Sequence, residues 1–244
     1  MKNTFIKVLA VTAAAAMMTA FLPAIPARAQ AQETKLIALT FDDGPNTTTT
    51  NDVLDILEEY GAKASFFLIG DNINEDSAKS VKRAYDMGCE IDNHSKTHSN
   101  MGGMAPDDIK AEVEFVDQKV LEITGEHTKF FRPPFIDVSQ TMYDNIDTPF
   151  ICAHGCRDWE DDVSADERLR LMLDNENTPV QDGMMFLLHV SDKNDTTLEV
   201  VDRAIPILKE RGYSFATVPQ LFEMHGIPKK NNGQLWTVVG QAHS

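Results

Sequence analysis

The sequence predicts an α/β fold of one domain, with parallel strands arranged in an open or incomplete barrel. Two observations support this prediction. Short apolar runs of strand length alternate with longer segments whose apolar residues recur at helical spacing, which is the pattern of a parallel sheet covered by helices. After a leader-like segment at 1–29 is set aside, about 215 of the 244 residues remain, a length common for a single α/β barrel.

The first half of the predicted domain contains three strands and three helices. Residues 35–41 form an apolar run that stops at two carboxylates, Asp42 and Asp43. Several potential N-caps follow, and a helical pattern then runs to Gly61, which is typical of a helix end. The same alternation predicts further strands at 62–70 and 89–92 and further helices at 77–87 and 107–124.

The second half continues the alternation. Strands are predicted at 129–132, 150–153, 184–189 and 213–218, with helices at 139–146, 165–173 and 198–211. Pro206 lies inside the last of these helices, where we expect a kink. Seven predicted strands separated by helices suit an incomplete barrel better than a full eight-stranded one.

Residues 1–29 have the pattern of a secretory signal peptide. Lys2 and Lys7 supply the positive start, residues 8–22 the apolar centre, and Ala-Arg-Ala at 27–29 the cleavage site. A membrane anchor is the alternative, but two prolines interrupt the end of the apolar run. We therefore expect export, a mature domain at 30–244 and no stable membrane insertion after cleavage.

The mature domain is strongly acidic. The net charge of −16 becomes about −19 once Lys2, Lys7 and Arg28 are removed with the leader. Such a surface argues against nucleic acid or an anionic membrane as partner. It is compatible with a neutral or amine-containing substrate.

Three cysteines, Cys89, Cys152 and Cys156, are an odd number for an exported protein. At most one disulfide can form, and a bond between Cys152 and Cys156 would require a sharp turn, because four strand residues span roughly 13 Å. We expect all three to be buried thiols.

Polar side chains that could take part in catalysis or metal binding follow several of the predicted strands. Function in parallel α/β folds lies at the carboxyl ends of the strands. Asp42 and Asp43 follow the first strand, His94 and His98 the third, Arg132 the fourth, Asp158 and Trp159 the fifth, and His189 the sixth. Taken singly, each has a structural explanation, and Asp-Asp-Gly-Pro at 42–45 is an ordinary polar turn. Their joint position favours a functional site.

His94 and His98 are four residues apart, so one tight loop or helical turn can direct both imidazoles to one point. A lone His-x-x-x-His is more often incidental. With a carboxylate from a neighbouring strand end, however, the two histidines complete the three-ligand set of an open catalytic zinc site. The pattern therefore predicts a divalent-metal site.

Five segments together resemble the motifs of a known family. They are Thr-Phe-Asp-Asp-Gly-Pro at 40–45, His-Ser-Lys-Thr-His at 94–98, Arg-Pro-Pro-Phe at 132–135, Arg-Asp-Trp at 157–159 and Leu-Leu-His at 187–189. In this order they resemble the motifs of the NodB-homology polysaccharide deacetylases, carbohydrate esterase family 4. The resemblance extends over about residues 35–222. It implies a distorted (β/α) barrel of about seven parallel strands and removal of acetyl groups from polysaccharides.

The resemblance also implies roles for the polar residues. Asp43, His94 and His98 would hold the divalent metal, with zinc expected and cobalt or nickel as alternatives. Asp42 would be the base that deprotonates the water activated by the metal. His189 would be the acid that protonates the leaving group.

Five further residues take supporting roles in the same resemblance. Arg132 would orient the base, and Asp158 would in turn hold Arg132. Trp159 and Leu187 would shape the pocket around the acetyl methyl group. Phe135 would present its backbone N–H to the oxyanion.

Four positions depart from the family pattern. Phe135 replaces the usual tyrosine, Ile136 a glycine, Gly155 an aspartate, and Val190 a second aspartate. None removes a metal ligand, the base or the acid. They alter the rim of the cleft, so they bear on the substrate more than on catalysis.

Together with the signal peptide, the resemblance predicts a secreted or cell-wall-associated enzyme that hydrolyses N-acetyl groups of amino-sugar polymers such as peptidoglycan or chitin, and we expect a monomer. The alternative within this site is an O-acetyl esterase acting on xylan, because an ester is easier to hydrolyse than an amide. A non-catalytic glycan-binding protein would be favoured by a missing ligand or base, and none is missing.

Overall fold

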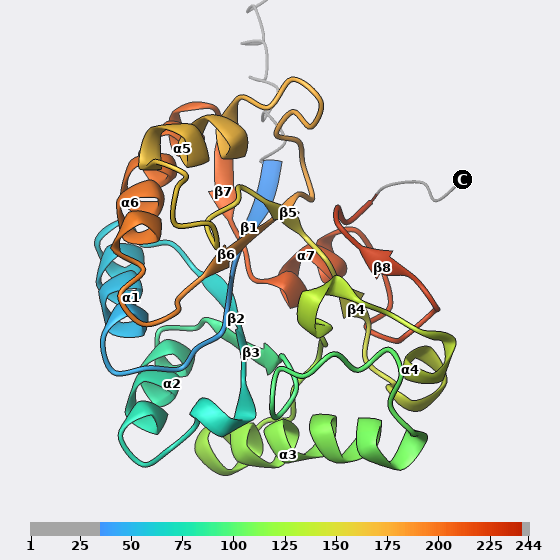
Figure 1. Cartoon of the computed structure of the whole chain (residues 1–244). Coiled ribbons are helices and arrows are strands. Elements are labelled where there is room, and N and C mark those ends of the chain that lie inside the picture. The colour runs from blue at the N-terminus through green and yellow to red at the C-terminus, as the bar shows by residue number, and fades with distance from the viewer. Residues whose placement is uncertain (1–34, 241–244) are drawn as a thin grey trace, which may run out of the picture. The chain divides into compact units, whose positions relative to one another are not determined.

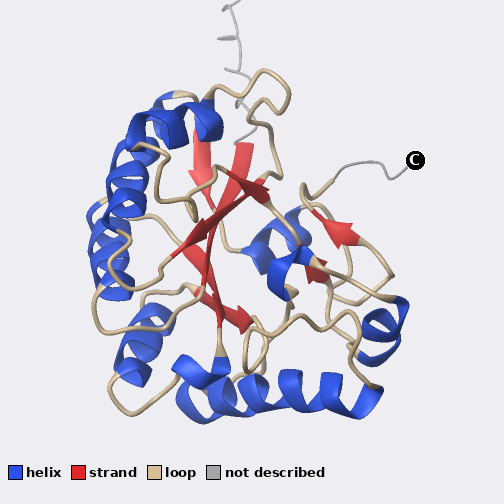
Figure 2. Cartoon of the chain, viewed as in Figure 1, coloured by secondary structure: helices blue, strands red, loops and turns tan. Residues whose placement is uncertain are grey.

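The centre of the fold is a mostly parallel sheet built on β1 (Figure 1, Figure 2). The computed structural model describes residues 35–240, so the predicted signal peptide at 1–29 lies outside the described residues. The sheet contains β3 (Glu90–Asn93), β2 (Ala64–Leu68), β1 (Lys35–Asp42), β6 (Met185–His189) and β5 (His154–Gly155) in that spatial order, and β7 (Tyr213–Phe215) pairs with the start of β1. The predicted α/β class is confirmed.

The strand register places the carboxyl ends of the central strands beside one another. Asp42 lies opposite Phe67 on β2 and opposite His189 on β6. Leu68 lies opposite Asn93, so His94 follows β3 near the same edge. Because all of these pairs are parallel, the residues that follow each strand meet at one edge of the sheet.

Helices cover one face of the sheet. The residues of β1 that point to this face, Ile37, Leu39 and Phe41, belong to the same buried cluster as apolar residues of the surrounding helices. These helices are α1 (Thr49–Glu59), α2 (Ser77–Asp86), α3 (Pro106–Thr124), α5 (Ala165–Leu173) and α6 (Asp195–Glu210). None of the helices between residues 35 and 240 is long and apolar enough to cross a membrane.

The other face of β1 also packs against apolar side chains. Ala38 joins a second buried cluster with Phe67, Phe222 of α7 (Val218–Met224) and Trp236 of β8 (Leu235–Trp236). β8 pairs with β4 (Phe150–Ile151) in a small separate sheet. Burial on both faces explains why the strands read as continuous apolar runs instead of alternating ones.

Single bridges continue the pairing beyond the regular sheet. Phe131 forms isolated parallel bridges to Asn93 on one side and Phe150 on the other. The predicted strand at 129–132 is therefore reduced to one bridging residue. The first two N–H groups of the segment, those of Lys129 and Phe130, donate to the Asp92 side chain instead of a backbone carbonyl.

The other strand predictions need two corrections. The predicted strand at 150–153 divides into β4 and β5, and Ala153 between them has a φ of 70°, which breaks a strand. The predicted strand at 213–218 ends at Phe215. Val218 opens α7, where Thr217 and Gln220 form a capping box.

The remaining elements agree with the expected pattern. Ser139 is the N-cap of α4 (Gln140–Asn145), and its side chain accepts a hydrogen bond from the N–H of Met142. α6 begins three residues earlier than predicted, after Asn194, and continues through Pro206 as one helix. All three cysteines are free thiols; Cys89 and Cys156 are buried as expected, but Cys152 is only half-buried, so the expectation was wrong for Cys152.

We predict that Phe150→Ala lowers the free energy of unfolding by about 3–5 kcal/mol, the usual cost of removing a buried phenyl ring. Phe150 is fully buried, and its ring lies 5.2 Å from that of Phe131 and 4.5 Å from that of Tyr143. Denaturant unfolding measures the loss. Met224→Ala is the matched control, because Met224 is 69% exposed and its change should stay within about 0.5 kcal/mol. Similar losses in both variants would contradict this packing.

Candidate active site

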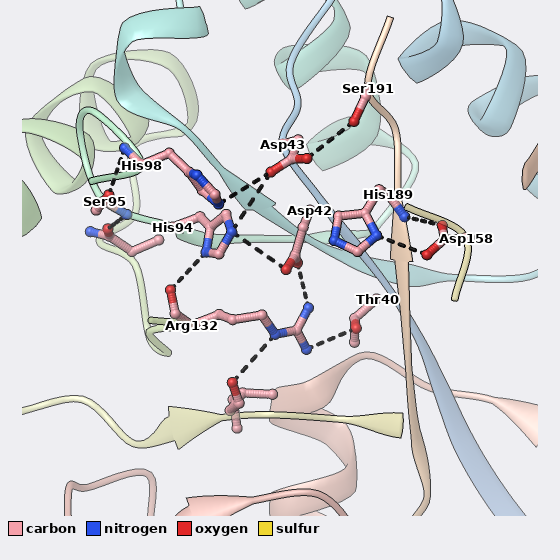
Figure 3. A network of polar contacts seen from close by, with 12 residues as sticks. Thr40, Asp42, Asp43, His94, Ser95, His98, Arg132, Asp158, His189 and Ser191 are labelled. Carbon is pink, nitrogen blue, oxygen red and sulfur yellow. Dashed lines mark hydrogen bonds and ion pairs between the residues drawn. The ribbon is translucent and has the colours of Figure 1, made fainter. Parts of the chain in front are cut away.

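A cavity of about 400 Å³ opens where β1, β3 and β6 end. Its volume lies in the range of small-molecule sites. It is lined by Asp42, Asp43, His94, His98, Pro133, Phe135, Ile136, Trp159, Leu187 and His189. Eight of the ten residues singled out from the sequence therefore meet in one cavity. The other two, Arg132 and Asp158, lie directly behind it as partners of Asp42 and His189 (Figure 3).

Asp42 is held by a buried ion pair. It ends β1 and is almost completely buried, and its Oδ1 accepts a hydrogen bond from the guanidinium of Arg132. Arg132 is fully buried, and its guanidinium lies over the Phe67 ring at 4.1 Å. The predicted contact between Arg132 and the base is therefore present.

Thr40 is a functional neighbour that the sequence argument missed. Its hydroxyl accepts a hydrogen bond from Arg132 at 2.9 Å and donates one to the carbonyl of Phe186 at 2.6 Å. Thr40 lies two residues before Asp42 and so shares its face of β1. A threonine in this position of an otherwise apolar run was the available signal.

His94 is oriented to bind a metal through Nε2. Its Nδ1 lies 2.7 Å from the carbonyl oxygen of Arg132; a carbonyl only accepts, so Nδ1 carries the hydrogen. Burial lowers the pKa of His94 to about 3, so the ring is neutral. A neutral imidazole with one nitrogen hydrogen-bonded and the other free is the usual form of a metal ligand.

Asp43 and His98 complete the ligand set. Oδ1 of Asp43 lies 3.8 Å from Nε2 of His94 and 3.7 Å from Nε2 of His98, and all three potential ligand atoms lie within 4.8 Å of one another. Tetrahedral zinc ligands at about 2.1 Å from the metal are about 3.4 Å apart. Among the described residues, the buried Oδ1 of Asp43 has no hydrogen-bond partner. The donor set therefore fits a divalent cation.

His189 is held by Asp158. The Nδ1–H of His189 donates to Asp158 Oδ1 at 2.8 Å, and the backbone N–H of His189 donates to Oδ2 at 2.6 Å. Thr197 also donates to Oδ2, at 3.0 Å. Nε2 is left as the ring nitrogen available to the cavity.

The expected contact between Asp158 and Arg132 is wrong. In the part of the chain that the structure describes, no hydrogen bond or ion pair joins these two residues. Asp158 uses both carboxylate oxygens on His189 and Thr197, whereas Arg132 uses its donors on Asp42, Thr40 and the carbonyl of Ile151. Asp158 thus holds His189, whereas Asp42 is the carboxylate that pairs with Arg132.

The electrostatic environments of Asp42 and His189 differ. Burial raises the pKa of Asp42 from its usual value, although the charges of Arg132 and His189 oppose this. Burial alone would lower the pKa of His189, but the hydrogen bond and charge of Asp158, with Asp42 and Asp43, outweigh it and raise the pKa to about 9. A raised carboxyl pKa strengthens a base, and a raised imidazole pKa keeps the acid protonated near neutral pH.

Apolar side chains form the walls of the cavity. Trp159 is 52% exposed, and its ring lies 5.7 Å from the His189 ring, nearly perpendicular to it. Phe135 is 65% exposed, and its ring contacts His98 edge to face at 4.7 Å. A Cβ at Gly155 would lie 2.8 Å from the Trp159 ring. The glycine that stands here in place of the family's aspartate therefore leaves room for the indole.

Backbone strain concentrates around this cavity. Asp43, His98, Phe135 and Ile136 all line it and all have positive φ angles, between 54° and 70°. Non-glycine residues rarely adopt this region, and such residues cluster at functional sites. His154, near the same sheet edge, does not line the cavity; its pKa is lowered by burial.

Comparison with known proteins identifies the family. The family described as polysaccharide deacetylase matches residues 29–147. The chain is also 31% identical over 195 residues to a peptidoglycan-N-acetylglucosamine deacetylase of Bacillus cereus, covering 77% of this chain and 88% of that protein. The chain belongs to the polysaccharide deacetylase family. Relatives in this family are named for the removal of acetyl groups.

Two other relatives of this polysaccharide deacetylase carry names connected with xylan. A bifunctional xylanase/deacetylase of Pseudobutyrivibrio xylanivorans is 43% identical over 208 residues, which cover 85% of this chain and 34% of the relative. The chain thus spans about a third of that relative's length. A family 4 acetyl xylan esterase of Clostridium thermocellum, solved with a cobalt ion, is 36% identical with a TM-score of 0.80, covering 85% of this chain and all of that one (100%).

We predict that Asp158→Asn lowers the pKa of His189 in the metal-free deacetylase from about 9 to its unperturbed value near 6.5 or below. The variant loses the anionic partner, while the burial that disfavours the imidazolium remains. Titration of the ring by NMR measures the shift.

The same prediction has a stability consequence. A histidine pKa raised in the folded state stabilises fully below the unfolded pKa, and this stability is lost as the pH rises through about 9. Asp158→Asn should abolish that dependence. Asp166→Asn is the control, because Asp166 is an exposed partner of Arg203, and it should leave the His189 titration unchanged. A His189 pKa that stays near 9 in Asp158→Asn would contradict the assigned pairing.

Proposed function

We propose that this polysaccharide deacetylase removes acetyl groups from an acetylated polysaccharide with a metal-activated water, an aspartate base and a histidine acid. The observation that carries the proposal is the convergence of three groups on one cavity. A potential metal-ligand set lies at Asp43, His94 and His98, a carboxylate at Asp42, and a protonatable imidazole at His189. Asp42 and His189 are direct neighbours in the register of β1 and β6.

The ligand set supports a divalent metal as cofactor. Two imidazoles and one carboxylate suit zinc, and the cobalt ion of the xylan esterase relative makes cobalt an alternative. When bound, the metal supplies Lewis acidity, which lowers the pKa of a water molecule and polarises the acetyl carbonyl.

Asp42 is proposed to accept the proton of the attacking water. Its carboxylate lines the cavity, while Arg132, which is itself hydrogen-bonded to Thr40, holds it from behind. Burial raises the pKa of this carboxyl group, which strengthens it as a base, while the charge of Arg132 opposes the rise. One oxygen can therefore accept a proton without reorganisation of the side chain.

His189 is proposed to donate a proton to the departing sugar oxygen or nitrogen. Its Nδ1–H is committed to Asp158, so the transferable proton is on Nε2. With a pKa of about 9 the ring is protonated at neutral pH. The nearby Trp159 and Leu187 line the apolar wall, which suits the methyl group of an acetyl substituent.

Among acetylated polysaccharides, the comparisons favour acetylxylan. The relatives named for xylan are 43% and 36% identical, against 31% for the peptidoglycan deacetylase. We therefore rank O-acetyl groups of xylan above the N-acetyl groups of peptidoglycan or chitin that the motifs alone suggested. The pattern at residues 1–29 supports the further proposal that the enzyme acts outside the cell.

We predict that the two adjacent carboxylates separate by mutation. Asp43→Asn replaces an anionic ligand by a neutral amide, so metal affinity and turnover should both fall, and added metal should restore part of the activity. Asp42→Asn leaves the three ligands in place, so metal content should stay near that of the wild type while turnover falls by roughly 10²–10⁴-fold, the usual contribution of a general base. Metal analysis beside turnover measures both effects.

Folding must be checked in the Asp42→Asn variant, because it leaves the buried Arg132 without its counter-charge. Thermal unfolding gives that check. If Asp42→Asn is the variant that loses metal, the two roles are reversed. If both variants keep metal and activity, the proposed site is wrong.

We predict that the mature enzyme releases acetate faster from acetylated xylan than from chitin oligomers or peptidoglycan fragments. An ester has the better leaving group, and the more similar relatives are named for xylan. Mass spectrometry detects loss of acetyl groups from each substrate, and Asp42→Asn is the negative control. Preferential release from either amino-sugar substrate would overturn the ranking while leaving the deacetylase function intact.

A further inference from the structure

Asp43 is a proposed metal ligand that lies just outside regular secondary structure. It directly follows β1, has a φ of 70°, and its side chain is 26% exposed. A partly exposed carboxylate on strained backbone can rotate unless other groups fix it. What holds Asp43 therefore decides whether the ligand set is ready to bind.

The side chain of Asp43 is fixed by Ser191. The Ser191 hydroxyl donates to Oδ2 of Asp43 at 3.1 Å (Figure 3). This contact occupies one carboxylate oxygen and leaves Oδ1 toward the two histidines, at 3.8 Å from His94 and 3.7 Å from His98. The hydroxyl thus selects which oxygen is presented as the ligand.

The backbone of Asp43 is fixed by Asn72. The side-chain amide of Asn72, at the end of the short helix η1 (Gly70–Asn72), donates to the backbone carbonyl of Asp43 at 2.8 Å. This hydrogen bond restrains the peptide group that follows the strained residue. Asn72 is exposed, so its contribution should be smaller than that of half-buried Ser191.

Ser191 itself has little freedom to move. The N–H of Val190 donates to the carbonyl of Asp42 at 3.0 Å, and the Asn46 side chain donates to the carbonyl of Val190 at 2.5 Å. On the other side of Ser191, the Thr48 hydroxyl donates to Asp192 at 2.6 Å. The segment that carries Ser191 is thereby attached to the loop that follows Asp43.

We propose that Ser191 and Asn72 are positioning residues for the metal ligand Asp43. Neither belongs to the five motifs from which the function was inferred. The proposal rests on the proposed metal-dependent function and deepens it. Groups that hydrogen-bond a ligand typically change metal affinity by 10–100-fold when removed, because they fix ligand orientation before the metal arrives.

The test measures metal affinity without substrate. Metal-free protein is titrated with cobalt(II) against a competing chelator and followed by visible absorption. Ser191→Ala should bind cobalt about 10-fold more weakly than the wild type, and Ser191→Thr, which keeps the hydroxyl, should retain most of the affinity. Asn72→Ala should show a smaller loss, and the double variant should be weaker than either.

Thr47→Ala is the matched control. Thr47 is exposed and lines the same polar groove as Asn72 and Ser191, but no contact joins its side chain to Asp43 in the described structure. Its cobalt affinity should equal that of the wild type. Thermal unfolding of the metal-free variants separates a local effect from misfolding, since the proposal requires unchanged stability of the metal-free fold within about 1 kcal/mol.

The outcomes are distinct. Wild-type affinity in Ser191→Ala would overturn the proposal, as would a Ser191→Thr variant as weak as Ser191→Ala, because the hydroxyl would then not be responsible. A wild-type protein that binds no cobalt or zinc would instead overturn the proposed metal-dependent function itself.

Discussion

The site depends on one buried arginine. Arg132 is fully buried and forms an ion pair with Asp42, while its backbone carbonyl accepts the Nδ1–H of His94. A buried charge is tolerated only when it is paired and hydrogen-bonded. Asp42, Thr40 and the Ile151 carbonyl meet that requirement. One residue therefore holds the proposed base and orients a metal ligand, so these two parts of the site cannot move independently.

The two proposed proton-transfer groups have partners of opposite charge. Asp42 faces a cation, Arg132, whereas His189 faces an anion, Asp158. Each partner stabilises the charged form of its neighbour: the carboxylate in one case and the imidazolium in the other. The two groups lie side by side on β1 and β6, yet one is poised to accept a proton and the other to donate one. Adjacent residues of a strand point to opposite faces, so Asp42 and Asp43 can line the same cavity because the chain leaves the strand geometry at Asp43.

Much of the fold could be predicted from the sequence because the central strands are continuous apolar runs and the long helices have apolar residues at helical spacing. The prediction failed where a side-chain hydrogen bond or a change of backbone conformation interrupts an apolar run. Residues 129–132 have strand-like composition, but the Asp92 carboxylate takes the N–H groups of Lys129 and Phe130. Similarly, Ala153 breaks a predicted strand through its positive φ. At Thr217, the capping box with Gln220 starts a helix inside another predicted strand.

The sequence by itself predicted ten residues of the site, from polar side chains at the ends of predicted strands and from the resemblance to a family whose five motifs contain these residues. All ten predicted residues line the cavity or contact a residue that does. Only the tertiary structure decided which of these residues contact one another. It assigned Asp158 to His189 and revealed Thr40, Asn72 and Ser191 as supporting residues. The physical reason is that hydrogen-bond partners depend on distance and direction in space, and residues 31 or 148 positions apart leave no spacing pattern in the chain.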